Sequence, residues 1–64
     1  MTVDDFIKKC DEYNYTFKLS NIYCWNLQLK HASFDSEYAY IKNCRELSDL
    51  LNDGLKYMKH RKTL

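Results

Sequence analysis

Apolar residues near the start of the chain recur at the spacing of an α-helix. Thr2 stands where an N-cap is expected, with Asp5 three residues later. Asn14 suits the left-handed conformation that ends a helix. The pattern predicts a helix at about residues 3–13. Its apolar stripe consists of Val3, Phe6, Ile7, Cys10 and Tyr13.

Beyond Asn14 apolar and polar residues alternate, which is typical of half-buried strands. The first alternating segment has the apolar residues Tyr15, Phe17 and Leu19. Ser20-Asn21 after it predicts a turn. A second, longer strand is expected to end near His31. Its apolar face is formed by Tyr23, Trp25, Leu27 and Leu29.

A loop and a third strand are predicted next. Residues 32–36 include polar turn-forming side chains and favour a hairpin loop. Residues 37–42 alternate again, with Ala39 and Ile41 on one face and Tyr38 and Tyr40 on the other. The alternation is compatible with either face pointing inward.

A second amphipathic segment follows the third strand. Asn43, with Glu46 three residues later, is typical of a helix start. The segment predicts a helix at about residues 44–59. Gly54 lies within it at a cost of about 1 kcal/mol relative to Ala, so we expect the helix to stop or bend there. The apolar stripe consists of Cys44, Leu47, Leu51, Leu55 and Met58.

The order helix, three strands, helix indicates an α+β fold. With short connections, the simplest arrangement is a three-stranded antiparallel sheet whose apolar face is covered by one N-terminal and one C-terminal helix. This two-layer αβββα arrangement occupies residues 1–64 as a single domain.

Length and composition argue against an enzyme. A chain of 64 residues removes only about 60% of its surface from water on folding, and a substrate cavity of about 300 Å³ or more is hard to fit beside its core. His31 and His60 have no Ser or Cys neighbour at a recognised motif spacing, and a single Gly excludes a Gly-rich phosphate loop. We expect a non-catalytic protein that needs no cofactor and acts through its surface.

Apolar runs and cysteines bear on location and redox state. The longest apolar runs have four residues, far short of the roughly 20 that span a bilayer. Acids stand near the N-terminus where a signal peptide carries bases. Cys10, Cys24 and Cys44 are an odd number without a CxxC pair. We expect no membrane association, no metal, reduced thiols and a cytoplasmic protein.

Charge is distributed unevenly along the chain. Residues 1–53 carry a net charge of −3 and residues 54–64 one of +4. Bases interleaved with an aromatic residue are typical of segments that contact phosphates. The αβββα order is also that of double-stranded-RNA-binding domains, but these need a basic cluster at the start of their second helix, where residues 43–49 have one base and two acids. The candidate nucleic-acid-binding residues are Lys56, Lys59, Arg61 and Lys62.

Tyrosine is abundant, with six residues in the chain. Several must reach the surface, because Phe6, Phe17 and Trp25 already compete for a small core. Exposed Tyr side chains are favoured at protein interfaces, although Tyr is also an ordinary strand former.

The first two thirds of the chain resemble a known family. The segments concerned are Asp5-Phe6-Ile7, the run Tyr15-Thr16-Phe17-Lys18-Leu19-Ser20, a hairpin tip with Asp35 and Glu37-Tyr38, and a closing helix. Together they are similar to the small phage-encoded anti-CRISPR proteins that inhibit Cas9, most of all the compact type with an α-β-β-β-α core. The likeness spans residues 2–41.

The resemblance implies inhibition without catalysis. In that family carboxylates take the place of DNA phosphates against Arg and Lys of the effector, and the hairpin between the second and third strands enters the nuclease region. Carried over by position, the resemblance implies that the partner contacts Tyr15, Asp35, Glu37 and Tyr38. The chain departs from the family at Asn14, where the family has an acid, and in its net charge of +1, where the family is strongly acidic.

Three hypotheses about function remain. The leading one is a small phage or mobile-element protein that binds and inhibits a host protein, in its most specific form a CRISPR effector such as Cas9. The alternative is a nucleic-acid-binding regulator that uses the basic C-terminal helix. A third is a homodimer that pairs through an open edge strand. The sequence favours the acidic hairpin for a protein partner and the basic tail for a phosphate partner.

Overall fold

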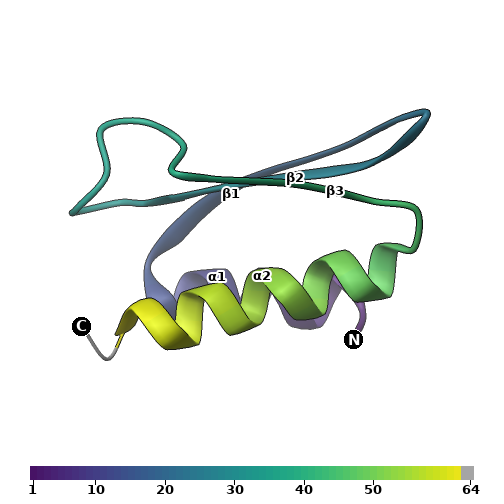
Figure 1. Cartoon of the computed structure of the whole chain (residues 1–64). Helices are drawn as coiled ribbons and strands as arrows, with labels where there is room; N and C mark the ends of the chain where they lie inside the picture. The colour runs from purple at the N-terminus through teal and green to yellow at the C-terminus, as the bar shows by residue number, and fades with distance from the viewer. Residues whose placement is uncertain (63–64) are drawn as a thin grey trace.

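The computed structural model describes residues 1–62, with side chains as far as Arg61. Three strands form one antiparallel sheet, in which they lie side by side in chain order, and both helices lie on the same side of it (Figure 1). The predicted α+β fold, a two-layer αβββα arrangement, is confirmed. The elements are α1 (Val3–Tyr13), β1 (Tyr15–Ile22), β2 (Cys24–His31), β3 (Tyr40–Cys44) and α2 (Leu47–Lys62).

Helix α1 begins and ends through local interactions. The Thr2 side chain accepts a hydrogen bond from the backbone N–H of Asp5 at 3.1 Å. Asn14 has a φ of 64°, and its N–H donates to carbonyls in the last turn. The predicted helix bounds, cap and stop are confirmed, because each depends on residues close in sequence.

The β1–β2 hairpin is longer than predicted. Its register runs without interruption as far as Ile22 opposite Cys24. Ser20 and Asn21, the predicted turn, pair with β2, and the chain reverses at Tyr23, whose φ is 68°. The predicted turn was wrong because strand pairing continues past the residues with the strongest local turn propensity.

Strand β3 begins three residues later than predicted, at Tyr40 rather than at residue 37. The preceding segment, including Tyr38, belongs to the β2–β3 loop, which we define as residues 32–39. Tyr40 lies opposite buried Leu29 and packs against the core, whereas Ile41 on the other face is 62% exposed. The face with Tyr40 is therefore the inward one.

Helix α2 begins three residues later than predicted, at Leu47 rather than at residue 44. Cys44 pairs with Trp25 in the sheet, which keeps it extended. Asn43 is not the N-cap, since it too lies in β3 and accepts a side-chain hydrogen bond from Asn26 across the sheet. These tertiary pairings override the local start signal.

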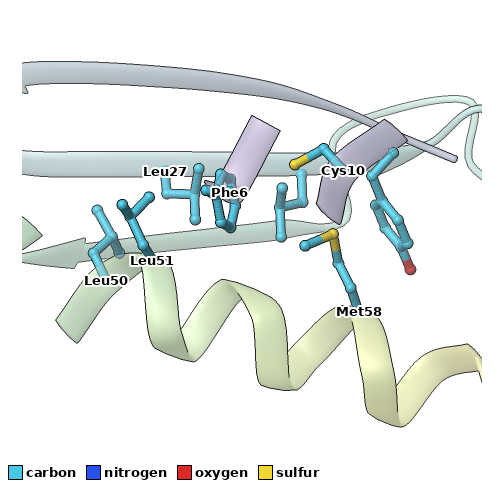
Figure 2. Packing of buried hydrophobic residues seen from close by; sticks show 8 residues of the cluster. Phe6, Cys10, Leu27, Leu50, Leu51 and Met58 are labelled. Carbon is cyan, nitrogen blue, oxygen red and sulfur yellow. The ribbon is translucent and has the colours of Figure 1, made fainter. Parts of the chain in front are cut away.

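The core lies between the sheet and the two helices (Figure 2). Trp25, Phe17 and Leu19 pack against it from half-buried positions. Its buried members are Phe6, Cys10, Tyr15, Leu27, Leu29, Leu50, Leu51 and Met58.

Gly54 lies in the middle of α2, and the helix continues through it to Lys62. Of the expected stop or bend, the stop is therefore wrong. A Cβ at this position would lie 2.7 Å from Leu27 Cδ2 and 3.2 Å from Phe6 Cε1. The absence of a side chain lets α2 approach both β2 and α1 closely. The close packing comes with a helix-propensity cost of about 1 kcal/mol relative to Ala.

Candidate functional site

The β2–β3 loop carries the acidic residues expected at a partner interface, and its first half is held by His31. Nδ1 of His31 accepts the backbone N–H groups of Ser33 at 3.0 Å and Phe34 at 3.2 Å. The His31 and Phe34 rings stack with their centroids 4.3 Å apart. The loop therefore has a defined conformation of its own.

Asp35 forms a bidentate ion pair with Arg61 of α2. Arg61 donates from both terminal nitrogens to the two carboxylate oxygens, at 2.7 and 2.6 Å, and one of these nitrogens also donates to the Tyr57 hydroxyl at 2.9 Å. The backbone N–H of His31 donates to the same carboxylate at 2.8 Å. Only 9% of the Asp35 side chain is exposed.

The ion pair shifts the pKa values of both side chains. The Arg61 guanidinium, followed by the His31 backbone N–H, lowers the pKa of Asp35 to about 2. The Asp35 carboxylate in turn raises the pKa of Arg61. The resemblance implies a protein partner for Asp35, and the charge pattern suggests a phosphate for Arg61. In the fold, each side chain neutralises the other.

Tyr15 is a core residue, 7% exposed. Its ring meets the His31 ring edge-on at 5.0 Å and the Tyr57 ring at 6.1 Å. Burial raises the pKa of its hydroxyl. The structure thus brings Tyr15 to the same corner as Asp35 and Arg61, but on the inside, where it offers a partner almost no surface.

Glu37 and Tyr38 take no part in the hydrogen bonds described for Asp35 and Arg61. Glu37 is exposed. Tyr38 is half-buried, and its ring centroid lies 4.9 Å from Lys18 Nζ and 5.3 Å from Lys30 Nζ. Two of the four residues implied by the resemblance therefore retain accessible surface.

One of the basic residues near the C-terminus, Arg61, is already paired with an acid of the fold. Lys56 and Lys59 are exposed on α2, whereas Arg61 is held by Asp35. The side chain of Lys62 lies outside the described residues. Within residues 1–61, two of the candidate phosphate contacts are thus available.

The opposite end of the sheet holds a feature that the sequence interpretation missed. Ile22 and Tyr23, which we call the hairpin tip, are 73% and 104% exposed at the β1–β2 turn. Tyr23 has a φ of 68°, a region that non-Gly residues rarely occupy. The apolar run of residues 22–25 could have indicated this exposure. Successive residues of a strand point to opposite faces, so a sheet with one buried face cannot bury all four side chains.

A pocket of about 320 Å³ opens between the last turn of α1, the β2–β3 loop and the C-terminal part of α2. Its lining includes Tyr13, His31, Phe34, Met58 and Arg61. A cavity of this size was expected to be hard to fit beside the core, yet one forms at the rim between these elements. Two of its lining residues, Tyr15 and Met58, also belong to the core.

The cysteines form neither a disulfide nor a metal cluster in the part of the chain that the structure describes. All three are free, and burial raises the pKa of Cys10 to about 12. Residues 1–62 contain no cluster of three His, Cys, Asp or Glu side chains placed to hold a metal ion. In the same range, neither helix is long and apolar enough to cross a membrane.

Comparisons with known proteins found no matching family model, no matching curated protein and no matching solved structure. The functional argument therefore depends on the geometry of this chain.

Proposed function

We propose that this protein binds and inhibits a host protein without catalysis. Its most specific form is a phage or mobile-element inhibitor of a CRISPR effector nuclease such as Cas9, acting in the bacterial cytoplasm. The observation that supports this best is the hairpin tip, where Ile22 and Tyr23 project into solvent at 73% and 104% exposure.

The tip is unfavourable for the isolated fold. A Tyr with positive φ costs about 1 kcal/mol or more, which Gly or Asn would avoid. Burying the two apolar side chains would gain about 1.5–3 kcal/mol each, and here that gain is forgone. A partner that covers the tip would recover it, and aromatic anchors of this kind dominate binding energy at protein interfaces.

The tip replaces part of the contact set implied by the resemblance. Asp35 and Tyr15 serve the fold, so they are left out of the proposed surface. Glu37 and Tyr38 stay in it as a secondary contact at the other end of the sheet. Inhibition then results from covering a surface that the host protein needs.

A DNA-cleavage assay with a purified Cas9–guide RNA complex tests the specific form. We expect the wild-type protein to suppress cleavage and the Ile22→Ser/Tyr23→Ser variant to need at least tenfold more protein for the same effect. Ile41→Ser is the matched control, because Ile41 is 62% exposed on β3, away from the tip. Absence of suppression by the wild type would eliminate Cas9 as the partner.

Affinity capture from bacterial lysate tests the broader form. Proteins retained by the wild type and by Ile41→Ser, but lost with the tip variant, identify the partner. Equal retention by all three proteins would remove the tip from the proposal.

The nucleic-acid alternative retains one supporting observation, the exposure of Lys56 and Lys59 on α2. Two phosphate contacts predict a slope of about −1.8 for log K against log salt with duplex DNA. No binding at about 50 mM salt would eliminate this candidate, since weak electrostatic binding is strongest at low salt.

A further inference from the structure

The two edges of the sheet differ in how they are protected against pairing with another strand. β3 has five residues and carries Lys42, whose Nζ lies 2.6 Å from Asp53 Oδ2 on α2. Lys42 lies opposite Leu27, so this charge faces the helical layer. A short strand with an inward-pointing charge is a known device against edge pairing.

β1 lacks these devices. It has eight residues, pairs with β2 without a bulge, and contains Lys18 as its single charged residue. Within residues 1–62, the backbone hydrogen bonds formed outside the helices and the sheet involve no residue of β1. Its outer N–H and C=O groups are therefore available to a new strand.

The inward face of β1 is incompletely covered. Phe17 and Leu19 are half-buried, whereas their cross-strand partners Leu29 and Leu27 are fully buried. Phe17 packs edge-on against Phe6, with ring centroids 5.7 Å apart. Apolar side chains on an added strand would cover the exposed flanks of both β1 residues.

The other face of β1 favours a negatively charged side chain on an added strand, because it carries Lys18. Lys18 and, diagonally across from it on β2, Lys30 both approach the Tyr38 ring. None of the three strands contains Asp or Glu. A carboxylate on an added strand would thus lie beside Lys18 and meet no acid from the sheet.

We propose that the β1 edge accepts an extended strand of the partner protein whose side chains alternate between apolar and acidic. This inference rests on the proposed function and gives its binding mode: backbone pairing along β1, continued by the hairpin tip at the end of the same strand. A second copy of this chain is the poorer occupant, because β1 has no carboxylate to place beside Lys18.

Synthetic eight-residue peptides test the inference without a host protein. The probe alternates Val and Glu, and one control alternates Val and Lys. A second control carries N-methyl groups on alternate backbone nitrogens, which removes hydrogen-bond donors but keeps the side chains. Backbone amide exchange and chemical shifts of the wild-type protein are followed by NMR.

We expect the Val/Glu peptide to slow exchange at alternate amides of β1, to leave β3 unchanged, and to bind about threefold to tenfold more tightly than the Val/Lys peptide. Lys18→Glu should reverse this preference, and the N-methylated peptide should not bind. Equal binding of the two charged peptides, protection of β3, or no binding at millimolar concentration would overturn the inference. A wild-type dimer with protected β1 amides would do the same, since it identifies a second copy as the occupant.

Failure of the β1-edge inference can be distinguished from failure of the proposed function. If a host protein is captured through the tip while β1 amides exchange equally fast in the complex and in the free protein, the edge inference fails and the function stands. If the peptides bind β1 but no host protein depends on the tip, the proposed function fails instead.

Discussion

The two ends of β2 lead into connections of opposite character. At His31, the β2–β3 loop is held by side-chain hydrogen bonds and by the Asp35–Arg61 ion pair. At Cys24, a tight turn leaves Ile22 and Tyr23 in solvent. In the loop, Asp35 therefore serves the fold, whereas Glu37 and Phe34 stay exposed. At the turn, no side-chain contact of this kind within the described residues holds Ile22 or Tyr23, and both stay in solvent.

The largest contrast is expected between buried and exposed aliphatic residues on the hairpin. Leu29→Ala, fully buried, should cost about 3–5 kcal/mol and unfold much of the protein. Ile22→Ala, 73% exposed, should change stability by less than about 0.5 kcal/mol. Urea denaturation of both variants measures the difference, and similar losses would mean that the tip is part of the core.

Gly54 is the position at which α2 packs closely against β2, the strand between the two connections compared above. Gly54→Ala should lower the free energy of unfolding by about 1–2 kcal/mol, because overpacking against buried Leu27 and Phe6 exceeds the gain in helix propensity. Asn52→Ala, at an exposed position of α2, is the control and should be neutral or slightly stabilising. A stabilised Gly54→Ala would show that α2 can move away from the sheet.

The stability that the Asp35–Arg61 ion pair gives to the β2–β3 loop should depend on pH. The pKa of Asp35 is about 2 in the folded protein and 3.8 ordinarily. The ion pair therefore stabilises the fold fully above about pH 4, and this contribution is lost as the pH falls through about 2. Asp35→Asn should lower the melting temperature at neutral pH and flatten its decline between about pH 4 and 2.

Glu37→Gln serves as the control for acid sensitivity, because Glu37 is exposed in the same loop. It should keep the wild-type pH profile. If Asp35→Asn also keeps that profile, the ion pair does not stabilise the loop in solution.

A small effect of opposite sign, a gain in stability, is expected at the hairpin tip. Tyr23→Asn replaces a residue that tolerates positive φ poorly by one that adopts it readily, so it should stabilise the fold by a few tenths to about 1 kcal/mol. Thermal melting measures the change. A clear loss of stability would mean that the Tyr23 ring makes contacts in the free protein.

Local features of the fold were predictable from the sequence, and features set by distant contacts were not. The Thr2 cap, the Asn14 stop and the alternation that places Leu27 and Leu29 inward depend on neighbours in sequence. The start of α2 depends on Cys44 pairing with Trp25. The continuity of α2 through Gly54 likewise depends on packing against other elements.

The candidate site shows the same division. Asp35 and Arg61 are 26 residues apart, so composition and spacing could not reveal that they pair. Tyr15 alternates as a strand residue should, yet its burial depends on α2 closing over it, where Tyr57 meets its ring. The exposed tip was visible in the sequence only as an apolar run without a Gly or Asn for the turn.

One measurement tests the central claim, that the hairpin tip is kept for binding at the expense of stability. The melting temperature of Tyr23→Asn and its retention of the host partner are determined on the same preparation. We predict a melting temperature at or above the wild-type value together with at least a tenfold loss of partner binding. Undiminished binding by this variant would contradict the claim.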